Sequence, residues 1–382
     1  MTAEYRTRLD SSAPRVFGIK EIAKALGVSI GTVDRALHDR PGINPMTRAK
    51  VLKMAQTMGY RPNLAARWLK SQKQLLISVQ LPAEIASFFD ALRQGISDAA
   101  APFEPAVRLD FKTYPSLGIG DAEVFENSLR EGCNGIIIAP GDPAVVKPLI
   151  RKAARRHIPV VCVATDAPGT ERLAAVSACP YTNGAMAGEL LARFLAVHGK
   201  IAVVTGSLST EDHSQKLQGF KESLHACDET CQVVAVNEAH DNEHVAYRQM
   251  KETLRSHPDL HGVYVSTANS LPVLQAIEEA GLGGKLAVIT TDLFPELVPL
   301  VRSARVLATI HQRPRTQGRL AFEALYQFLV EGKCPLPRIR VASHVVMNSN
   351  LELFLDRILV EPEDLPETLP EPIWAAETSH AG

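Results

Sequence analysis

Six short apolar runs constrain the fold of this 382-residue chain more than any other feature. Each run has the length of a β-strand and lacks the polar alternation of a strand that is exposed on one face. A strand that is apolar on both sides has to be covered on both sides, which is typical of parallel sheets flanked by helices. The runs are residues 75–79, 135–139, 160–163, 201–204, 262–265 and 286–289.

Amphipathic stretches between these runs predict the helices that cover the sheets. Strands and helices alternate over about 270 residues, which is more than one doubly wound sheet needs. We therefore predict an α/β domain over residues 75–358 with two lobes, each a doubly wound sheet. The predicted helices are residues 88–101, 143–157, 183–198, 214–226, 243–256, 270–281 and 314–331.

Two helical stripes separated by a glycine occupy residues 19–37. Gly27 supplies a turn between them, and Ser29 is suited to cap the second helix. This pattern predicts a helix-turn-helix in a small all-α headpiece that precedes the α/β domain. The apolar stripes comprise Ile22, Ala23 and Leu26 in the first helix and Val33, Ala36 and Leu37 in the second.

The charge of the N-terminal region favours DNA as the partner of this pattern. Residues 1–73 carry 14 Lys/Arg against 5 Asp/Glu, whereas the rest of the chain carries 27 against 37. Two helices around a glycine turn also occur in αα-hairpins that bind nothing, but a basic head on an acidic body is typical of phosphate binding at one end. The second helix of a helix-turn-helix lies in the major groove, which places Ile30, Gly31, Thr32 and Arg35 near base edges and phosphates.

Four further motifs follow: Arg-Pro-Gly-Ile-Asn at 40–44, Thr47-Arg48, Gly-Tyr-Arg-Pro-Asn at 59–63 and Ala-Ala-Arg-Trp-Leu-Lys at 65–70. With the helix-turn-helix they resemble the headpiece of the LacI/GalR (lactose repressor) family. The resemblance implies a DNA-binding domain over residues 17–62 and a hinge helix and linker over 63–74. In that family a hinge-helix leucine opens the central base step from the minor groove, and Leu69 occupies its position. Asp34 departs from the family, which has serine there.

The DNA contacts that follow from the pattern and the resemblance fall in the recognition helix, the segment after it and the hinge. They are Ser29, Ile30, Gly31, Thr32, Arg35, Asn44, Arg48, Asn63, Ala66, Arg67 and Leu69.

Polar residues follow several of the predicted strands, as in Val-Ala-Thr-Asp at 163–166, Ile-Thr-Thr-Asp at 289–292 and Thr-Ile-His-Gln at 309–312. With Phe88-Phe89, they resemble the periplasmic sugar-binding-protein fold that LacI-type regulators use as an effector domain. The resemblance covers residues 75–355. It implies a small-molecule effector in the cleft between the lobes, where strand carboxyl ends converge. The chain is expected to cross between the lobes near residues 178–182, 306–310 and 340–344.

A sugar-like effector suits these residue types. A carboxylate accepts hydrogen bonds from two vicinal hydroxyls, an amide both donates and accepts, and an aromatic face covers the C–H side of a sugar ring. An isolated aspartate after a strand also often caps a helix, so the set as a whole carries the prediction. The implied effector contacts are Phe88, Phe89, Asp166, Lys216, Asp241, Asn269, Asp292 and Gln312.

Three departures from the family leave the effector open. Lys216, in Lys-Leu-Gln-Gly-Phe, replaces an arginine and offers a point charge instead of a planar fork. Ser270 replaces the aspartate of an Asn-Asp pair, and Asp241 stands where an aromatic residue usually stacks on the sugar. A polyol, a pentose or hexose, and a charged sugar derivative all remain alternatives.

We predict neither an enzyme nor a bound cofactor or metal. His-Asp-Asn-Glu-His at 240–244 fits the HxxEH pattern of a zinc-protease class, but Asp241-Asn242 after a predicted strand is typical of a helix N-terminus, where both histidines would be exposed. No phosphate-binding GxxxxGK[ST] motif and no GxSxG motif occurs.

The sequence predicts a cytoplasmic protein. It contains no apolar run long enough to span a membrane and no signal-peptide pattern. Its six cysteines form no CxxC pair and lie mostly beside apolar runs, which favours buried free thiols in a reducing compartment. Residues 1–16 and the acidic, proline-rich tail 359–382 are predicted to be disordered.

Together these features predict a transcriptional regulator of the repressor type that binds a pseudo-palindromic operator as a homodimer under the control of an effector. A solute-binding protein of a transporter and an enzyme acting on sugars are the alternatives. The former would need an export signal and no headpiece, and the latter a catalytic acid pair or metal cluster. Whether the effector induces or corepresses stays open, because one architecture serves both.

Overall fold

The computed structural model describes residues 19–37, 41–57, 74–195, 199–267 and 269–359. The chain forms two compact units. Unit 1 comprises Met1–Ala83, Arg93–Ser177 and Gln317–Ile339, and unit 2 comprises Glu84–Leu92, Ala178–Thr316 and Arg340–Gly382.

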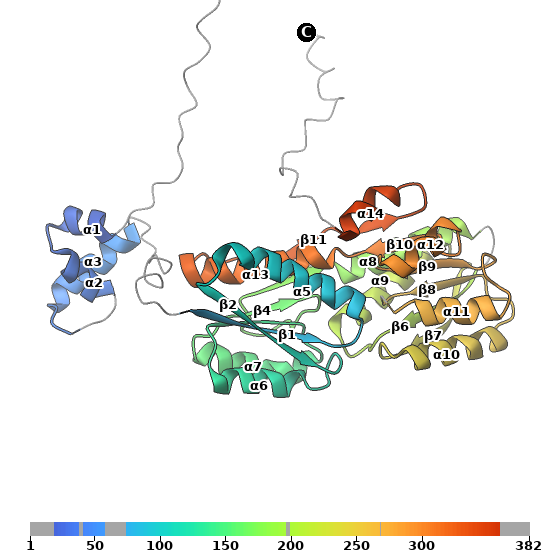
Figure 1. The fold of residues 1–382 in the computed structure, drawn as a ribbon, viewed down its shortest axis with the longest axis horizontal. Helices are drawn as coiled ribbons and strands as arrows, with labels where there is room; N and C mark the ends of the chain where they lie inside the picture. Colours follow the sequence, from blue (N-terminus) through green and yellow to red (C-terminus); the bar gives the residue numbers. More distant parts are fainter. Residues whose placement is uncertain (1–18, 38–40, 58–73, 196–198, 268, 360–382) are drawn as a thin grey trace, which may run out of the picture. The chain divides into compact units, whose positions relative to one another are not determined.

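Three helices form the headpiece at the N-terminal end of the described chain (Figure 1): α1 (Ile19–Leu26), α2 (Ile30–Leu37) and α3 (Pro45–Thr57). Gly27 has a φ of +63°, which a side-chain-free residue adopts readily, and it joins the first two helices. The Ser29 hydroxyl accepts a hydrogen bond from the Thr32 amide at 3.1 Å and so caps α2. The core buries residues of all three helices: Ile22, Ala23, Val33, Ala36, Val51 and Ala55.

Unit 1 is built on a six-stranded sheet of order β11-β5-β4-β3-β1-β2, in which β1 pairs in parallel with both β2 and β3. Helices α6 and α7 cover one face of this sheet, and α5 and α13 cover the other (Figure 1). The strands are β1 (Leu75–Pro82), β2 (Val107–Tyr114), β3 (Gly135–Ile138), β4 (Val160–Val163), β5 (Ala174–Ala178) and β11 (Arg338–Val341). The helices are α5 (Ala86–Ala100), the 3₁₀ turn η1 (Ala101–Phe103), α6 (Asp121–Glu131), α7 (Pro143–Arg155) and α13 (Pro314–Glu331).

Unit 2 is built on a second six-stranded sheet, of order β12-β10-β9-β8-β6-β7. Its pairs are parallel except for the antiparallel edge pair β10–β12. The strands are β6 (Lys200–Thr205), β7 (Gln232–Glu238), β8 (Gly262–Val265), β9 (Ala287–Thr291), β10 (Ala308–His311) and β12 (His344–Val346).

Helices pack on both faces of this second sheet. One apolar cluster joins α8 and α9 to the sheet, and another joins α10, α11, α12 and α14 to its opposite face. The helices are α8 (Pro180–Phe194), α9 (Glu211–Cys227), α10 (Glu243–Ser256), α11 (Leu271–Glu279), η2 (Pro295–Leu297), α12 (Val298–Arg302) and α14 (Glu352–Leu359).

Glycines bring α8 and α9 unusually close together. A Cβ atom on Gly184 of α8 would lie 1.9 Å from the carbonyl oxygen of Lys216, and one on Gly219 of α9 would lie 2.0 Å from that of Tyr181. Both neighbours are backbone atoms, so only glycine fits at either position. This contact fixes α9, and with it Lys216, against the sheet.

The predicted fold class is confirmed. All six predicted strands are present, as are the predicted helices, with no end shifted by more than four residues. The predicted crossing near residues 306–310 is wrong, because β10 stays in the sheet of unit 2 and the chain leaves that unit only after Thr316, in the first turn of α13.

The cysteine prediction is correct only in part. Cys162 and Cys231 are buried, whereas Cys227 and Cys334 are exposed because they lie at the end of α9 and in the segment after α13. All six are free. Among the described residues, no helix has the length and apolar character that crossing a membrane requires.

Candidate functional site

The outer face of α2 carries four of the residues predicted to meet DNA. Ile30 is 51% exposed, Gly31 and Arg35 are exposed, and Thr32 is half-buried with its hydroxyl 2.9 Å from that of Ser29. Val33, Ala36 and Leu37 of α2 pack in the headpiece core, whereas Ile30 lies outside it.

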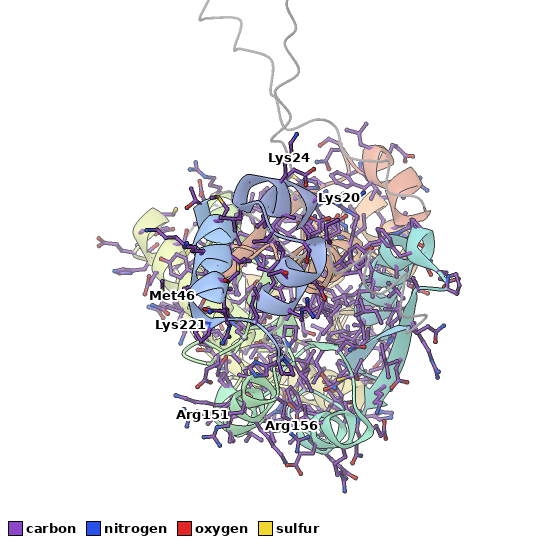
Figure 2. All side chains as sticks on the ribbon, turned by 90° about the vertical axis from the view of Figure 1, so that its left-hand side faces the viewer. Lys20, Lys24, Met46, Arg151, Arg156 and Lys221 are labelled. Atoms are coloured by element: carbon purple, nitrogen blue, oxygen red, sulfur yellow. The ribbon has the colours of Figure 1, made fainter. Side chains whose placement is uncertain are left out.

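The start of α3 carries two further predicted DNA contacts. The Asn44 side chain accepts a hydrogen bond from the Met46 amide at 2.9 Å, which caps the helix, and Arg48 lies one turn later and is half-buried. Figure 2 looks onto the headpiece, from which Lys20, Lys24 and Met46 project. The predicted hinge-helix contacts, namely Asn63, Ala66, Arg67 and Leu69, lie outside the described residues.

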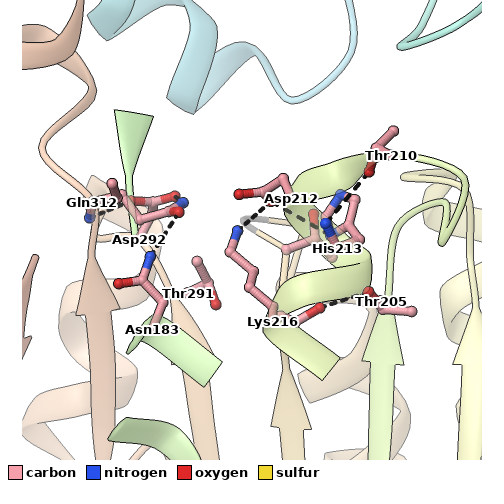
Figure 3. Close-up of polar contacts among 12 residues, drawn as sticks. Asn183, Thr205, Thr210, Asp212, His213, Lys216, Thr291, Asp292 and Gln312 are labelled. Atoms are coloured by element: carbon pink, nitrogen blue, oxygen red, sulfur yellow. Dashed lines mark hydrogen bonds and ion pairs between the residues drawn. The ribbon is translucent and has the colours of Figure 1, made fainter. Parts of the chain in front are cut away.

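Unit 2 gathers buried polar side chains at the carboxyl ends of its strands (Figure 3). Thr205 ends β6 and Thr291 ends β9, while Asp292 and Gln312 directly follow β9 and β10. Parallel strands end at one edge of a sheet, so these side chains meet although they are far apart in the sequence. Buried polar groups at such density are costly unless they bond one another or a ligand.

Asp292 and Gln312 form the centre of one half of this edge. The Gln312 backbone amide donates to Asp292 Oδ1 at 2.8 Å, and its side-chain amide donates to Oδ2 at 2.7 Å. Asn183, in the first turn of α8, donates to the Gln312 side-chain oxygen at 3.1 Å. Burial raises the pKa of Asp292 to about 6, although the two bonds from Gln312 and the charge of Lys216 act in the opposite direction.

The first turns of α9 supply the other half of this polar edge. Lys216 Nζ donates to Asp212 Oδ2 at 2.6 Å, a buried ion pair within one turn of the helix. His213 Nε2 lies 3.6 Å from Asp241 Oδ2. Burial acts to raise the pKa of Asp241, but the hydrogen bond and charge of His213 outweigh it and hold this pKa below its usual range.

Two neighbours fix the position of Asp241. Thr267 donates its hydroxyl hydrogen bond to Asp241 Oδ1 at 2.5 Å, and Asn269 Nδ2 donates to the Asp241 carbonyl at 3.0 Å. A Cβ atom on Gly206 would lie 2.3 Å from His213 Nε2 and 2.6 Å from Asp241 Oδ2, so glycine at this position leaves room for the pair.

The structure thus brings together five predicted effector residues in unit 2: Lys216, Asp241, Asn269, Asp292 and Gln312. Phe88 and Phe89 are 8% and 2% exposed and pack edge to face with ring centroids 5.1 Å apart. Ser270 is fully buried, and within the described part of the chain its hydroxyl has no hydrogen-bond partner.

Asp166 lies in unit 1, just after β4, and its carboxylate is already paired. Arg172 donates to it through both Nε and Nη2, the latter at 2.7 Å from Oδ2, and Arg338 Nε lies 3.6 Å from Oδ2. The Ala167 amide adds a bond of 2.6 Å to Oδ1. The sequence predicted the acid at this strand end but not the arginine that holds it.

The HxxEH residues take the positions expected of a helix start. Asn242 Oδ1 accepts from the Val245 amide at 3.0 Å and caps α10, and both His240 and His244 are exposed. Asp241 faces His213 instead of pairing with either of them.

Asp292 predicts a pH dependence of stability. Its pKa is raised on folding, so between pH 4 and pH 6 the folded protein holds a proton that the unfolded chain has lost, and stability falls as the pH rises through this window. We expect the unfolding free energy of the wild type, relative to that of Asp292→Asn, to fall by ~3 kcal/mol between pH 4 and pH 7. Urea unfolding across that range measures the difference.

The control for this prediction is Asp259→Asn. Asp259 is an exposed carboxylate whose pKa is lowered by a hydrogen bond from Lys200, so its contribution does not change above pH 4. A wild-type to Asp292→Asn difference that stays flat over the same range would contradict a raised pKa at Asp292.

Comparison with known proteins separates the two parts of the chain. Residues 18–63 match the family model of bacterial regulatory proteins, lacI family. Residues 77–333 match the periplasmic binding protein domain, which is two thirds of the chain. The chain therefore carries a domain of the lacI family of bacterial regulatory proteins at its N-terminal end, and over most of its length it belongs to the periplasmic binding protein domain family.

Among curated relatives, the chain is similar to catabolite control protein A of Priestia megaterium, with 28% identity over 54% of this chain and 60% of the relative. The match thus spans less than two thirds of that relative's length. The ribose operon repressor of Bacillus subtilis (strain 168) is 26% identical over 80% of this chain and 90% of the repressor.

The solved structures share the fold of the larger part. A solute-binding protein of an ABC transporter from Burkholderia graminis C4D1M, in complex with D-arabinose, superposes with a TM-score of 0.68 at 22% identity. The superposition covers 73% of this chain and 97% of that protein.

Sequence reasoning missed three residues of the edge in unit 2: Asn183, Asp212 and His213. All three lie in first turns of helices, not directly after strands, so a search of strand ends passes over them. Thr210, whose hydroxyl accepts from the His213 amide at 3.4 Å, is the signal for Asp212 and His213, because it marks the start of α9.

Proposed function

We propose that this protein is a transcriptional regulator that binds a pseudo-palindromic operator as a homodimer, with its affinity set by a small sugar-like effector. One observation carries the proposal. A headpiece with an outward-facing recognition helix shares one chain with an α/β unit that buries acids, amides and a lysine at its strand ends. A solute-binding protein has no use for the first feature, and an unregulated DNA-binding protein has none for the second.

On the DNA side, we assign base and phosphate contacts to the outer face of α2 and the start of α3, together with the hinge segment. The assignment comprises Ser29, Ile30, Gly31, Thr32, Arg35, Asn44 and Arg48, with Asn63, Ala66, Arg67 and Leu69 from the hinge. The basic balance of residues 1–73 supports it, since phosphate neutralisation supplies much of the affinity of such proteins.

On the effector side, we assign the polar strand ends of unit 2, with Asp166 from unit 1 and Phe88 and Phe89 at the first helix. The names of the relatives support a sugar, because one is a ribose operon repressor and one structure holds D-arabinose. Effector binding would change operator affinity by a coupling free energy of about 1–3 kcal/mol.

We further propose that the protein acts in the cytoplasm, without catalysis and without a cofactor or metal. The match to the lacI family supports this proposal, because the family consists of bacterial regulatory proteins. Residues 17–62, 63–74 and 75–358 would be its DNA-binding domain, hinge and effector-binding and dimerisation domain.

An electrophoretic mobility shift with DNA from upstream of the gene and of its neighbours tests the proposal. We expect retention that survives an excess of nonspecific DNA, and a change in retention with at least one member of a panel of pentoses, hexoses and polyols. Absence of specific retention on every fragment would exclude the regulator. Retention that no sugar alters would exclude the effector.

Two arginines of the headpiece should contribute differently to the affinity for DNA. Arg35→Ala should cost about 1–3 kcal/mol of operator affinity and little nonspecific affinity, because an arginine on a recognition helix can bond a guanine through two donors. Arg48→Ala, at the start of α3, should weaken all DNA alike. Fluorescence anisotropy with operator and scrambled duplexes at several salt concentrations measures both. Equal proportional losses in the two variants would refute this division.

A further inference from the structure

The polar edge of unit 2 contains more acids than bases. Asp212, Asp241 and Asp292 are 15%, 4% and 5% exposed at their side chains, and they surround one lysine, Lys216, and one histidine, His213. We call these five residues the acidic edge. They come from three places in the fold: the first turns of α9, the segment after β7 and the residue after β9.

The ammonium group of the acidic edge, that of Lys216, is already paired with a carboxylate. Lys216 is 2% exposed, and its Nζ donates to Asp212 at 2.6 Å (Figure 3). Its charge also acts on Asp241 and Asp292: it contributes to the lowered pKa of Asp241 and opposes the rise that burial causes in the pKa of Asp292. An anion that took Lys216 as its partner would leave Asp212 buried without its counter-charge, which is strongly unfavourable.

The carboxylates of Asp241 and Asp292, in contrast, can accept further hydrogen bonds. Asp292 receives one bond at each oxygen from Gln312, and Asp241 receives one from Thr267. Each carboxylate oxygen can accept two hydrogen bonds, so both groups have acceptor sites left for O–H or N–H donors.

A second observation points to a ligand at the same place. His213 is 4% exposed, and its Nδ1 has no hydrogen-bond partner among the residues that the structure describes, although it lies 3.8 Å from the Asp212 carboxylate. Its Nε2 faces Asp241 on the other side of the ring. A buried nitrogen of this kind is rare unless water or a ligand meets it.

We propose that the acidic edge selects an effector rich in hydrogen-bond donors and devoid of anionic groups, so that neutral sugars and polyols bind and sugar acids and sugar phosphates are rejected. The inference rests on the proposed function and narrows its effector class. The selection has two causes. Asp241 and Asp292 repel an anionic effector, and Lys216 does not offset this repulsion because it is paired with Asp212.

The test is a calorimetric titration of the full-length protein with matched sets of compounds: D-ribose, D-ribonate and D-ribose 5-phosphate, and D-glucose, D-gluconate and D-glucose 6-phosphate, with myo-inositol as a neutral polyol. We expect at least one neutral compound to bind, and the acidic members of its set to bind at least 100-fold more weakly. Tighter binding of an acid or phosphate would overturn the inference while leaving a sugar-responsive regulator in place. Binding of none of the compounds would overturn both.

A variant separates charge selection from shape. Asp212→Asn removes one negative charge and releases Lys216, so binding of the acidic compounds should increase at least tenfold relative to binding of their neutral partner. Asp259→Asn, which removes an exposed carboxylate of the same unit, should change neither. If Asp212→Asn folds, as judged by its thermal unfolding, and still rejects acids as the wild type does, selection does not come from the acidic edge. The wild-type titration tests the inference even if the variant fails to fold.

Discussion

Gly184→Ala is expected to destabilise unit 2 by more than about 3 kcal/mol, although alanine is the better helix former. The new Cβ atom would lie 1.9 Å from the Lys216 carbonyl oxygen and 2.7 Å from its carbonyl carbon. Both are backbone atoms in the middle of α9, so α8 and α9 have to separate. The gain of about 1 kcal/mol from replacing a helical glycine does not offset this separation.

Gly219→Ala should behave in the same way, since its Cβ atom would lie 2.0 Å from the Tyr181 carbonyl oxygen. Urea unfolding followed by far-UV circular dichroism measures both losses. A separated α9 would also move Lys216 and Asp212, so both variants should lose effector response even at temperatures where they remain folded.

The matched control is Gly283→Ala in the same unit. Its Cβ atom would lie 2.3–2.5 Å from the carboxyl end of Glu278, a flexible side chain that can turn away. We expect a loss below about 1 kcal/mol. Similar losses in Gly184→Ala and Gly283→Ala would mean that α8 and α9 adapt to a methyl group without separating.

The central strands were predictable because burial on both faces leaves a direct trace in the sequence. Residues 135–138 and 160–163 are apolar throughout and fully buried in the sheet of unit 1. Strand β2 escaped prediction because it lies at the edge of that sheet and pairs only with β1. Its sequence, Val-Arg-Leu-Asp-Phe-Lys-Thr-Tyr, mixes charged and apolar residues, since part of it faces solvent.

The third headpiece helix escaped for a related reason. Among the α3 side chains that the structure describes, Val51 and Ala55 are the buried members of the headpiece core. Its apolar periodicity is therefore weak, and Met46 and Leu52 are exposed apolar residues that obscure it further. Its start was nonetheless marked by Asn44-Pro45, an N-cap followed by proline at the first helical position.

The polar edge of unit 2 was predictable where a residue directly follows a strand. Asp292 and Gln312 follow β9 and β10, which are neighbours in the sheet, so their hydrogen bonds follow from the topology. The partnership of Asp241 with His213 did not follow, because it depends on how the first turn of α9 packs over the sheet. No spacing in the sequence encodes that packing.

In unit 1, an arginine in the loop after β4 already binds the carboxylate of Asp166, which the sequence had assigned to an effector. Arg172 follows Asp166 by six residues and binds it through two donors, and both side chains are about one-tenth exposed. Arg172 Nη1 also donates to the Pro337 carbonyl at 3.0 Å, which ties this loop to the segment before β11. A carboxylate held in this way has fewer acceptor sites left, so Asp166 holds the loop in addition to the effector contact proposed for it.

Arg172→Ala should therefore destabilise unit 1 by about 3 kcal/mol, because it leaves the Asp166 carboxylate buried without its main partner. Arg338→Ala is the matched control. Arg338 approaches the same carboxylate at 3.6 Å but is 54% exposed, so its removal should cost less than about 1 kcal/mol. In the double variant Asp166→Ala/Arg172→Ala no charge is left unpaired, and we expect a smaller loss than in Arg172→Ala alone. Chemical unfolding of the four proteins gives the comparison. Equal losses of stability in the two arginine variants, or a loss in the double variant equal to the sum of the single losses, would mean that solvent stabilises the carboxylate. Asp166 would then be free to serve an effector.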